Sequence, residues 1–205
     1  MKRFVDIVIA SIAILFLSPV FLFVAYKVRK HLGSPIFFCQ ERPGKDGKIF
    51  KMIKFRSMKN ALDAQGNLLP DEQRITSFGQ KLRATTLDEM PQLFNVLKGD
   101  MSIVGPRPQM PEFLEYYTTD QMRRHEVKPG MTGLAQVSGR NNLSWEEKFN
   151  LDVQYVENHN ILLDFKIMLK TVDVMLKREG INAPNQTVGS SRFTGSESQS
   201  GSIVK

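Results

Sequence analysis

One uncharged segment near the amino terminus restricts the fold of this chain more than any other part. Residues Ile7 to Tyr26 carry no charged side chain, and as a helix they would extend about 30 Å, enough to cross a bilayer. Ser18-Pro19 interrupts the middle, where a proline removes one helix hydrogen bond and bends the axis. We therefore predict a helix-break-helix within residues 1–32, with the Ser18 hydroxyl satisfying backbone groups that the bend frees.

Basic residues lie on both sides of this run: Lys2, Arg3, Lys27, Arg29 and Lys30. The positive-inside rule places both flanks on the cytoplasmic face, which predicts a re-entrant segment that enters one leaflet and returns. A kinked full span is the closer alternative. A secretory signal peptide is less favoured, because no small-residue cleavage pattern precedes the basic segment.

The composition allows one folded domain beside this membrane element. The chain has 205 residues, of which 41% are hydrophobic, and its 28 Lys and Arg against 21 Asp and Glu give a net charge of +7. Such a charge predicts anionic partners: phosphorylated substrates, anionic lipid or nucleic acid. Cys39 is the only cysteine, which excludes an internal disulfide framework, and the three histidines lack the spacing of a zinc site.

The segment Arg83 to Pro108 concentrates residues that can carry chemistry. Pro91 is suited to the first turn of a short apolar helix, and Gly99 is suited to its end. Asp88 and Glu89 then lie at the amino end, where the helix dipole favours an ionised carboxylate, as a nucleophile or metal ligand requires. Alternatively, Thr86 and Glu89 have the spacing of a capping box, in which Glu89 only pairs backbone donors.

The Pro-Arg-Pro sequence that follows favours phosphate binding. Pro106 and Pro108 hold Arg107 on a stiff, extended backbone, and a pre-aimed guanidinium is suited to bidentate phosphate binding. A solvated or structural arginine is the ordinary alternative.

A β-hairpin is predicted between the membrane segment and the carboxylates. Residues 35–40 and 49–56 read as strands, joined by a turn-rich segment that contains Asp46-Gly47. Lys54 and Arg56 lie near the end of the second strand. They either bind phosphates near Asp88 or protect an edge strand from aggregation.

The remaining segments predict surface structure and helices. Residues 60–74 are polar and form a long surface segment, and residues 129–142 form a glycine-containing loop in which Arg140 can reach a nucleotide. Ser144 opens a helix to about residue 159, and a second, amphipathic helix follows, either packed on the core or lying on the bilayer surface. Residues 189–205 are rich in serine and glycine and are predicted to be disordered.

Taken in order, five segments resemble one protein family. They are the apolar run with Ser18-Pro19, FFCQERPGKDGKIFKMIKFRSM, LRATTLDEMPQLFNVLKGDMSIVGPRP, KPGMTGLAQVSGR and LLDFKI. Together they are similar to the small monotopic phosphoglycosyl transferases of the bacterial sugar transferase family, over about residues 1–185. The resemblance implies an α+β fold of helices packed on a β-hairpin, with interfacial amphipathic helices. It also implies a membrane helix at 1–32, a catalytic domain at 33–188 and a tail at 189–205.

The same resemblance implies the reaction and its residues. Family members move a sugar 1-phosphate from a UDP-sugar to undecaprenyl phosphate, releasing UMP, with Mg²⁺. Asp88 corresponds to a nucleophile that forms an aspartyl phosphosugar intermediate, and Glu89 to its acid/base or metal-linked partner, so that both can hold the metal. The positions expected to bind phosphates are Lys54, Arg56, Arg83 and Arg107, while Arg140 is the substrate-binding candidate of the glycine-containing loop. Asp164 corresponds to a member of an active-site polar network.

Partners and location follow from this resemblance. We expect a UDP-sugar, undecaprenyl phosphate and anionic membrane lipid as partners, with later glycosyltransferases of the pathway and without nucleic acid, at the cytoplasmic face of a bacterial inner membrane. The short chain is most similar to members of protein N-glycosylation that use UDP-N,N'-diacetylbacillosamine. A membrane-tethered Mg²⁺-dependent phosphohydrolase and a non-catalytic membrane adaptor are the alternatives.

Overall fold

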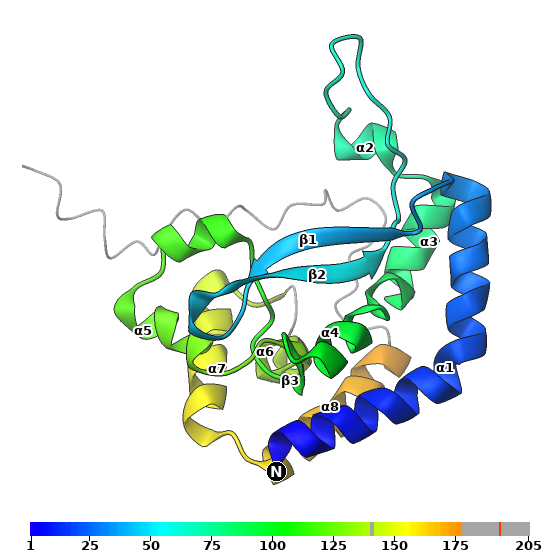
Figure 1. Ribbon diagram of the computed structural model, residues 1–205. Coiled ribbons are helices and arrows are strands. Elements are labelled where there is room, and N and C mark those ends of the chain that lie inside the picture. Colours follow the sequence, from blue (N-terminus) through cyan, green and yellow to red (C-terminus); the bar gives the residue numbers. More distant parts are fainter. Residues whose placement is uncertain (140–141, 178–192, 194–205) are drawn as a thin grey trace, which may run out of the picture. The chain divides into compact units, whose positions relative to one another are not determined.

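The computed structural model describes residues 1–139, 142–177 and 193, and its chain forms two compact units. Unit 1 comprises Met1–Arg3, Glu41–Phe50 and the chain from Gly99 onward, and unit 2 comprises Phe4–Gln40 and Lys51–Lys98. The helices are α1 (Lys2–Leu32), α2 (Asp71–Arg74), α3 (Ser77–Ala84), α4 (Gln92–Lys98), α5 (Thr119–Met122), α6 (Leu134–Ser138), α7 (Trp145–Asn158) and α8 (Ile161–Lys177). The strands are β1 (Phe37–Pro43), β2 (Ile49–Phe55), β3 (Ser102–Val104) and β4 (Gly130–Thr132). This mixture of helices and strands agrees with the predicted class (Figure 1).

Helix α1 passes through Ser18-Pro19 without ending, so the predicted break is a bend. Pro19 lies inside the helix, and the Ser18 hydroxyl donates to the carbonyl of Leu15 over 2.8 Å. Figure 1 shows the axis of α1 changing direction partway along, as expected where a proline removes one hydrogen bond. In the described part of the chain, α1 is the helix long and apolar enough to cross a membrane. Most of its large apolar side chains, Leu15 and Phe16 among them, are exposed.

Unit 2 is built on the second half of α1, the base of the hairpin, and helices α3 and α4. Its core consists of Val24, Val28, Phe55, Leu82 and Met90. The predicted hairpin is present, with β1 beginning and ending a few residues later than expected. Asp46 and Gly47 both have positive φ, at 57° and 71°, which is the backbone that a tight hairpin turn demands.

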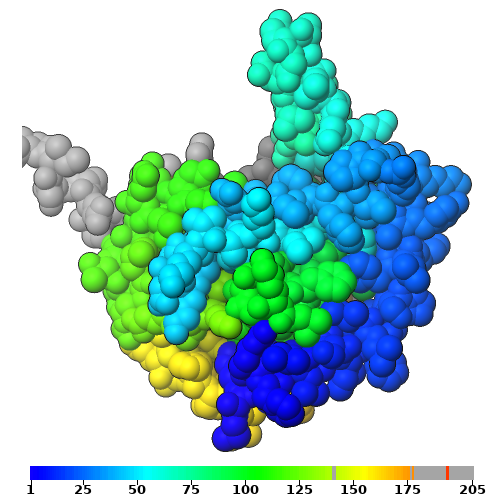
Figure 2. Space-filling view, in the orientation of Figure 1, coloured from blue at the N-terminus to red at the C-terminus, as the bar shows by residue number. Residues whose placement is uncertain are grey.

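The segment between β2 and α3 extends as an arm. Leu62 and Leu68 form an isolated antiparallel bridge, and the Asp63 carboxylate accepts backbone N–H groups of Gln65 and Asn67. Figures 1 and 2 show the part that carries α2 standing out from the rest of unit 2. The predicted polar surface segment is therefore an arm with its own short-range order.

Unit 1 holds a second, parallel pair of strands and the two long helices α7 and α8. Ser102 pairs with Gly130 and Val104 with Thr132. Helix α7 begins with the predicted capping box, in which the Ser144 hydroxyl accepts from the Glu147 N–H and the Glu147 carboxylate accepts from the Ser144 N–H. One core joins Val104, Val137, Tyr155 and Ile167. A second core of unit 1 is aromatic and contains Phe113, Tyr117, Phe149 and Phe193.

Helix α8 is both packed and exposed. Ile167 is buried in the core, and Leu163 and Met168 pack beside it. The large apolar side chains that α8 leaves exposed are Ile161, Leu162, Phe165, Leu169, Val172 and Met175. The helix therefore serves the core with one face and presents an apolar surface with the other. Of the predicted tail at 189–205, only Phe193 lies within the described residues.

Candidate active site

Asp88 and Glu89 lie in a tight turn that leads into α4. Residues Leu87–Glu89 form a single 3₁₀ turn, after Thr86 in a left-handed conformation with φ 59°. The Thr86 side chain makes no capping hydrogen bond, so the capping-box interpretation of Glu89 is wrong. Asp88 is 8% exposed and its turn is closed by the bond from the Glu89 N–H to the Thr86 carbonyl. Two neighbouring carboxylates are thus held on a short, hydrogen-bonded backbone.

Lys54 reaches this turn from strand β2. Its Nζ donates to Oε1 of Glu89 over 2.7 Å, and the two side chains are 18% and 14% exposed. Lys54 thus lies beside a carboxylate of the turn, which is the condition for its predicted phosphate-binding role. The role itself remains a prediction. A partly exposed ion pair of this kind contributes little net stability, and it leaves the ammonium group within reach of an anionic ligand.

Asn95 fixes the relation between α4 and β2, and sequence reasoning missed it. Its Oδ1 accepts from the Ile53 N–H over 2.9 Å, and its Nδ2 donates to the Lys51 carbonyl over 2.8 Å. The side chain is 1% exposed. These two bonds, on either side of Met52, hold the helix to the strand, and so they set where the carboxylate turn meets Lys54. The available signal was an amide inside an otherwise apolar helix face.

The other two basic residues predicted in unit 2 have structural partners. Arg56 is 5% exposed and donates to the carbonyls of Ser34 and Leu32, where α1 ends and its last carbonyl groups lack helical partners. Burial lowers the pKa of Arg56. Arg83 donates through Nε to the Ser57 hydroxyl over 2.9 Å. Their phosphate-binding roles remain predictions.

Arg107 lies in unit 1, on a backbone that is joined to the strand pair. The Gly105 N–H donates to the Thr132 carbonyl over 2.9 Å, and the Gly130 N–H donates to the Pro106 carbonyl over 3.0 Å. A side chain on Gly130 would place its Cβ 2.1 Å from the nitrogen of Gly105, so this close approach requires glycine. The Pro-Arg-Pro segment and the KPGMTG segment therefore form one unit of structure.

A buried arginine holds the same segment from the other side. Arg124 donates to the carbonyl of Arg107 over 2.7 Å and to Oδ2 of Asp152 over 2.6 Å. The side chains of Arg124 and Asp152 are 1% and 4% exposed. Burial is the largest single influence and acts to lower the pKa of Arg124, but the charges and hydrogen bonds of Asp152 and Tyr117 together outweigh it and raise that pKa, so the guanidinium is charged. Burial raises the pKa of Asp152, and Arg124 opposes this change.

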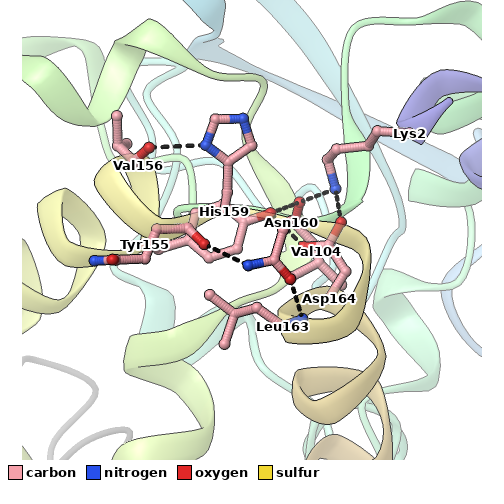
Figure 3. Close-up of polar contacts among 9 residues, drawn as sticks. Lys2, Val104, Tyr155, Val156, His159, Asn160, Leu163 and Asp164 are labelled. Carbon is pink, nitrogen blue, oxygen red and sulfur yellow. Dashed lines mark hydrogen bonds and ion pairs between the residues drawn. The ribbon is translucent and has the colours of Figure 1, made fainter.

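Asp164 is engaged in a network within unit 1 that contains the amino end of α1 (Figure 3). Its two carboxylate oxygens accept from Lys2 Nζ and from the Tyr155 hydroxyl, each over 2.6 Å. Both donors also reach the carbonyl of Val104. Asp164 therefore belongs to a polar network that joins the amino end of α1 to α8 and β3. A role of this network in the active site remains a prediction.

The predicted site residues are therefore distributed over both units. Unit 2 contains Asp88, Glu89, Lys54, Arg56 and Arg83, and it joins Lys54 to Glu89. Arg107 and Asp164 belong to unit 1. The predicted residue Arg140 lies outside the described residues.

The carboxylate turn is chemically suited to Mg²⁺. Over the described ranges, no group of three or more His, Cys, Asp or Glu side chains is gathered for a metal. Mg²⁺ is commonly held by one or two carboxylates together with substrate phosphates and water, and it does not need a full protein cage. Asp88 and Glu89 supply that donor set, so these residues fit a metal that arrives with a diphosphate substrate.

Comparison with known proteins identifies the class of molecule. The bacterial sugar transferase family matches residues 1–178. The chain is 52% identical over 196 residues to the uncharacterized sugar transferase EpsL of Bacillus subtilis, covering 96% of both chains. It is 41% identical to the undecaprenyl-phosphate galactose phosphotransferase of Salmonella typhimurium, covering 88% of this chain and 41% of that one. It is 40% identical to the UDP-glucose:undecaprenyl-phosphate glucose-1-phosphate transferase of Klebsiella pneumoniae, covering 83% and 39%.

This chain therefore belongs to the bacterial sugar transferase family. It is an enzyme, a transferase of sugar phosphates, as the sequence predicted. The chain spans nearly the whole of EpsL but about two fifths of the galactose and glucose transferases. The apolar helix α1 and the family together indicate membrane association.

Proposed function

We propose that this enzyme transfers a sugar 1-phosphate from a UDP-sugar to undecaprenyl phosphate through a covalent intermediate on Asp88. The observation that carries the proposal is the rigid turn that presents Asp88 beside Glu89, with Lys54 at 2.7 Å from Glu89. The names of relatives from Salmonella typhimurium and Klebsiella pneumoniae supply the acceptor and the kind of donor.

The proposed reaction has two displacements at one phosphorus atom. An Asp88 carboxylate oxygen attacks the β-phosphorus of the UDP-sugar, the bond from that phosphorus to the bridging oxygen breaks, and UMP leaves with the bridging oxygen. A phosphate oxygen of undecaprenyl phosphate then attacks the phosphorus of the aspartyl phosphosugar. The Asp88–phosphorus bond breaks, which restores the carboxylate and yields undecaprenyl diphosphate sugar.

The neighbouring residues have supporting roles in this proposal. Glu89 serves as acid/base or metal-linked partner, and its pairing with Lys54 holds it in place. Mg²⁺, when bound by Asp88 and Glu89, offsets the charge of the diphosphate. We assign phosphate binding to the cationic side chains Lys54, Arg56, Arg83, Arg107 and Arg140, and a supporting polar network to Asp164.

We also propose that the enzyme is monotopic on the cytoplasmic face of the inner membrane, with residues 1–32 re-entrant. Lys2 pairs with Asp164 of α8, while Val24 and Val28, further along α1, pack on Phe55. The first contact lies within unit 1 and the second within unit 2. Basic residues on both flanks of the apolar run support having the two ends of the helix on the cytoplasmic side. The exposed apolar side chains of α8 support contact with the bilayer surface, where a lipid phosphate and a soluble nucleotide sugar can meet. In this proposal residues 33–188 are catalytic and residues 189–205 form the tail.

Epitope accessibility tests the topology. A tag placed before Met1 should react with antibody in inside-out vesicles and remain protected in intact spheroplasts, as should a tag at the carboxyl terminus. Reaction of the amino-terminal tag alone in spheroplasts would establish a kinked full span.

Screening several UDP-sugars as donors would identify the sugar that the enzyme transfers. Relatives are named for galactose, glucose and exopolysaccharide production, so we propose a first membrane step of polysaccharide or glycoconjugate assembly. UDP-N,N'-diacetylbacillosamine is our first candidate donor, and UDP-galactose and UDP-glucose are the comparison donors. Anionic lipid and later glycosyltransferases are the further proposed partners.

Intact mass spectrometry tests the covalent step. The enzyme is mixed with Mg²⁺ and each UDP-sugar without lipid acceptor, in the wild-type form and as Asp88→Asn. We expect a wild-type adduct of one phosphosugar that undecaprenyl phosphate discharges, and none in the variant. Asp120→Asn, the same change at an exposed carboxylate, should form the adduct.

The other outcomes separate the alternatives. Lipid product without an adduct would mean direct attack by the lipid phosphate, with Asp88 as a metal ligand. Consumption of UDP-sugar without lipid product would indicate a phosphohydrolase, and full transfer by Asp88→Asn would remove Asp88 from the chemistry.

A further inference from the structure

The aromatic core of unit 1 receives one side chain from far along the chain. We define the aromatic box as Phe113, Tyr116, Tyr117, Trp145 and Phe149. Phe193 inserts into it and is 4% exposed. Its ring centroid lies 5.0 Å from Phe149 and 5.4 Å from Phe113, within the range of favourable aromatic pairs. The box is thus filled by the ring of a residue that lies 44 positions beyond Phe149.

Two walls of the box also enclose Arg124. The guanidinium lies 5.4 Å from the ring centroid of Tyr117 and 5.2 Å from that of Phe149. The Phe193 ring lies 5.9 Å from Tyr117 and 5.0 Å from Phe149. Phe193 therefore packs against the two rings that shield Arg124 from water, and such shielding strengthens the electrostatic contacts of a buried cation.

Arg124 in turn connects the box to the Pro-Arg-Pro segment. One of its nitrogens donates to the Tyr117 hydroxyl over 2.7 Å, and another donates to the carbonyl of Arg107 over 2.7 Å. Burial raises the pKa of Tyr117, so its phenol is neutral and can accept this bond. Asp152 holds the same guanidinium through its carboxylate. A continuous set of contacts thus leads from Phe193 to the backbone of Arg107.

We propose that Phe193 is a positioning residue for Arg107. Its ring packs against Tyr117 and Phe149, the two rings that orient Arg124, and Arg124 holds the carbonyl of Arg107 in place. The inference rests on the proposed function, in which Arg107 binds a phosphate of the UDP-sugar. Phe193, to which sequence analysis assigned no role, thereby contributes to donor binding.

The test uses the full-length enzyme in detergent with Phe193→Ala, and the UDP-sugar that the wild type turns over best. We expect the KM for that donor to rise about three- to tenfold, in line with couplings between contacting residues, while kcat stays within about twofold. Trp145, the only tryptophan, lies 6.0 Å from Phe193, so its emission should change in the same variant.

Three further variants separate positioning from general packing. Phe193→Tyr retains an aromatic ring and should restore the donor KM. Tyr117→Phe removes the hydroxyl that Arg124 contacts, so adding Phe193→Ala to it should raise KM less than Phe193→Ala does alone. Tyr116→Phe removes a hydroxyl at the exposed edge of the box and is the matched control, with an unchanged KM.

Each remaining outcome overturns the inference. If Trp145 emission changes while the donor KM does not, Phe193 only fills the box. If Trp145 emission stays as in the wild type, Phe193 is not seated there in solution. If activity falls only in proportion to the folded fraction, the effect is one of stability. Failure of the wild type to transfer any sugar phosphate would instead contradict the proposed function. The Trp145 measurement would in that case still show whether Phe193 packs in the aromatic box.

Discussion

Two ion pairs in this enzyme join a basic side chain to a carboxylate, but their surroundings differ. Arg124 and Asp152 are sealed between aromatic rings, with side chains 1% and 4% exposed, and the guanidinium makes four hydrogen bonds. Lys54 and Glu89 are 18% and 14% exposed and meet through one bond of 2.7 Å. A sealed pair cannot exchange its partner without a large desolvation cost, whereas a partly open pair can share its cation with a substrate phosphate. The first pair is suited to hold structure and the second to take part in chemistry.

The largest expected effect comes from breaking the sealed pair. Arg124→Met leaves Asp152 buried without its partner, and we expect a loss of about 3–5 kcal/mol in the free energy of unfolding. Unfolding in denaturant, followed by Trp145 emission in detergent, measures this loss. The double variant Arg124→Met/Asp152→Leu removes both charges and should recover much of the stability. If the double variant is no more stable than Arg124→Met, the stability loss comes from losing the ion pair and not from leaving the Asp152 carboxylate buried without a partner.

The second largest effect is expected from acidification, which should destabilise the fold around the buried pair of Arg124 and Asp152. Burial, with the neighbouring charge of Arg124, lowers the pKa of His125 to about 4. Between about pH 6.5 and pH 4 the unfolded chain therefore binds a proton that the folded chain does not, so stability is lost as pH falls. The loss attributable to His125 approaches roughly 3 kcal/mol near pH 4.

Unfolding measured at pH 7 and near pH 4.5 checks this effect. His125→Gln keeps a donor for the Gly44 carbonyl, which His125 contacts over 3.1 Å, and it should make the pH dependence shallower. Equal slopes for the wild type and His125→Gln would show that another group causes the acid sensitivity.

A smaller effect is expected where the open pair is supported. Asn95→Leu leaves the Ile53 N–H and the Lys51 carbonyl without their side-chain partner, which costs about 1–3 kcal/mol. Because Asn95 also sets the position of α4 against β2, transfer should slow in folded enzyme. Steady-state kinetics on the folded fraction measures this, and wild-type kcat/KM would show that α4 keeps its position without Asn95.

The smallest effect on stability belongs to the open pair itself. Lys54→Met should change the free energy of unfolding by about 1 kcal/mol or less, since a partly exposed pair contributes little. Its kcat/KM should nevertheless fall about 100-fold, if Lys54 stabilises developing charge. Comparing both quantities with those of Arg124→Met sharpens the contrast. A large stability loss in Lys54→Met would mean that the two pairs have similar roles.

Local patterns predicted the elements of this fold better than its long-range contacts. Ser144 and Glu147 marked the start of α7, and Pro91 and Gly99 bracket α4 as their backbone preferences require. No local signal pairs Arg124 with Asp152, 28 residues away, or seats Phe193 among rings. Such contacts depend on how elements pack, and a sequence window does not contain that information.

The candidate site was predicted in part for the same reason. Family motifs pointed to Lys54 and Glu89, and the structure joins them. Asn95 was missed because an amide in a short apolar helix looks like an ordinary surface residue until its two backbone partners are known. At Ser18-Pro19 the sequence predicted a break, but the helix only bends there. A helix can lose one hydrogen bond at a proline and continue.

The parallel pairing of β3 with β4 has a consequence for recombination between relatives. Gly105, Pro106, Gly130 and Thr132 exchange backbone hydrogen bonds across a gap that admits no side chain on Gly130. A chimera that inherits the Pro-Arg-Pro segment from one parent and the KPGMTG segment from another would have to reproduce this close approach between backbones of different origin. Exchanging residues 102–132 as one block keeps both segments from the same parent, although the strands themselves contribute only three residues each.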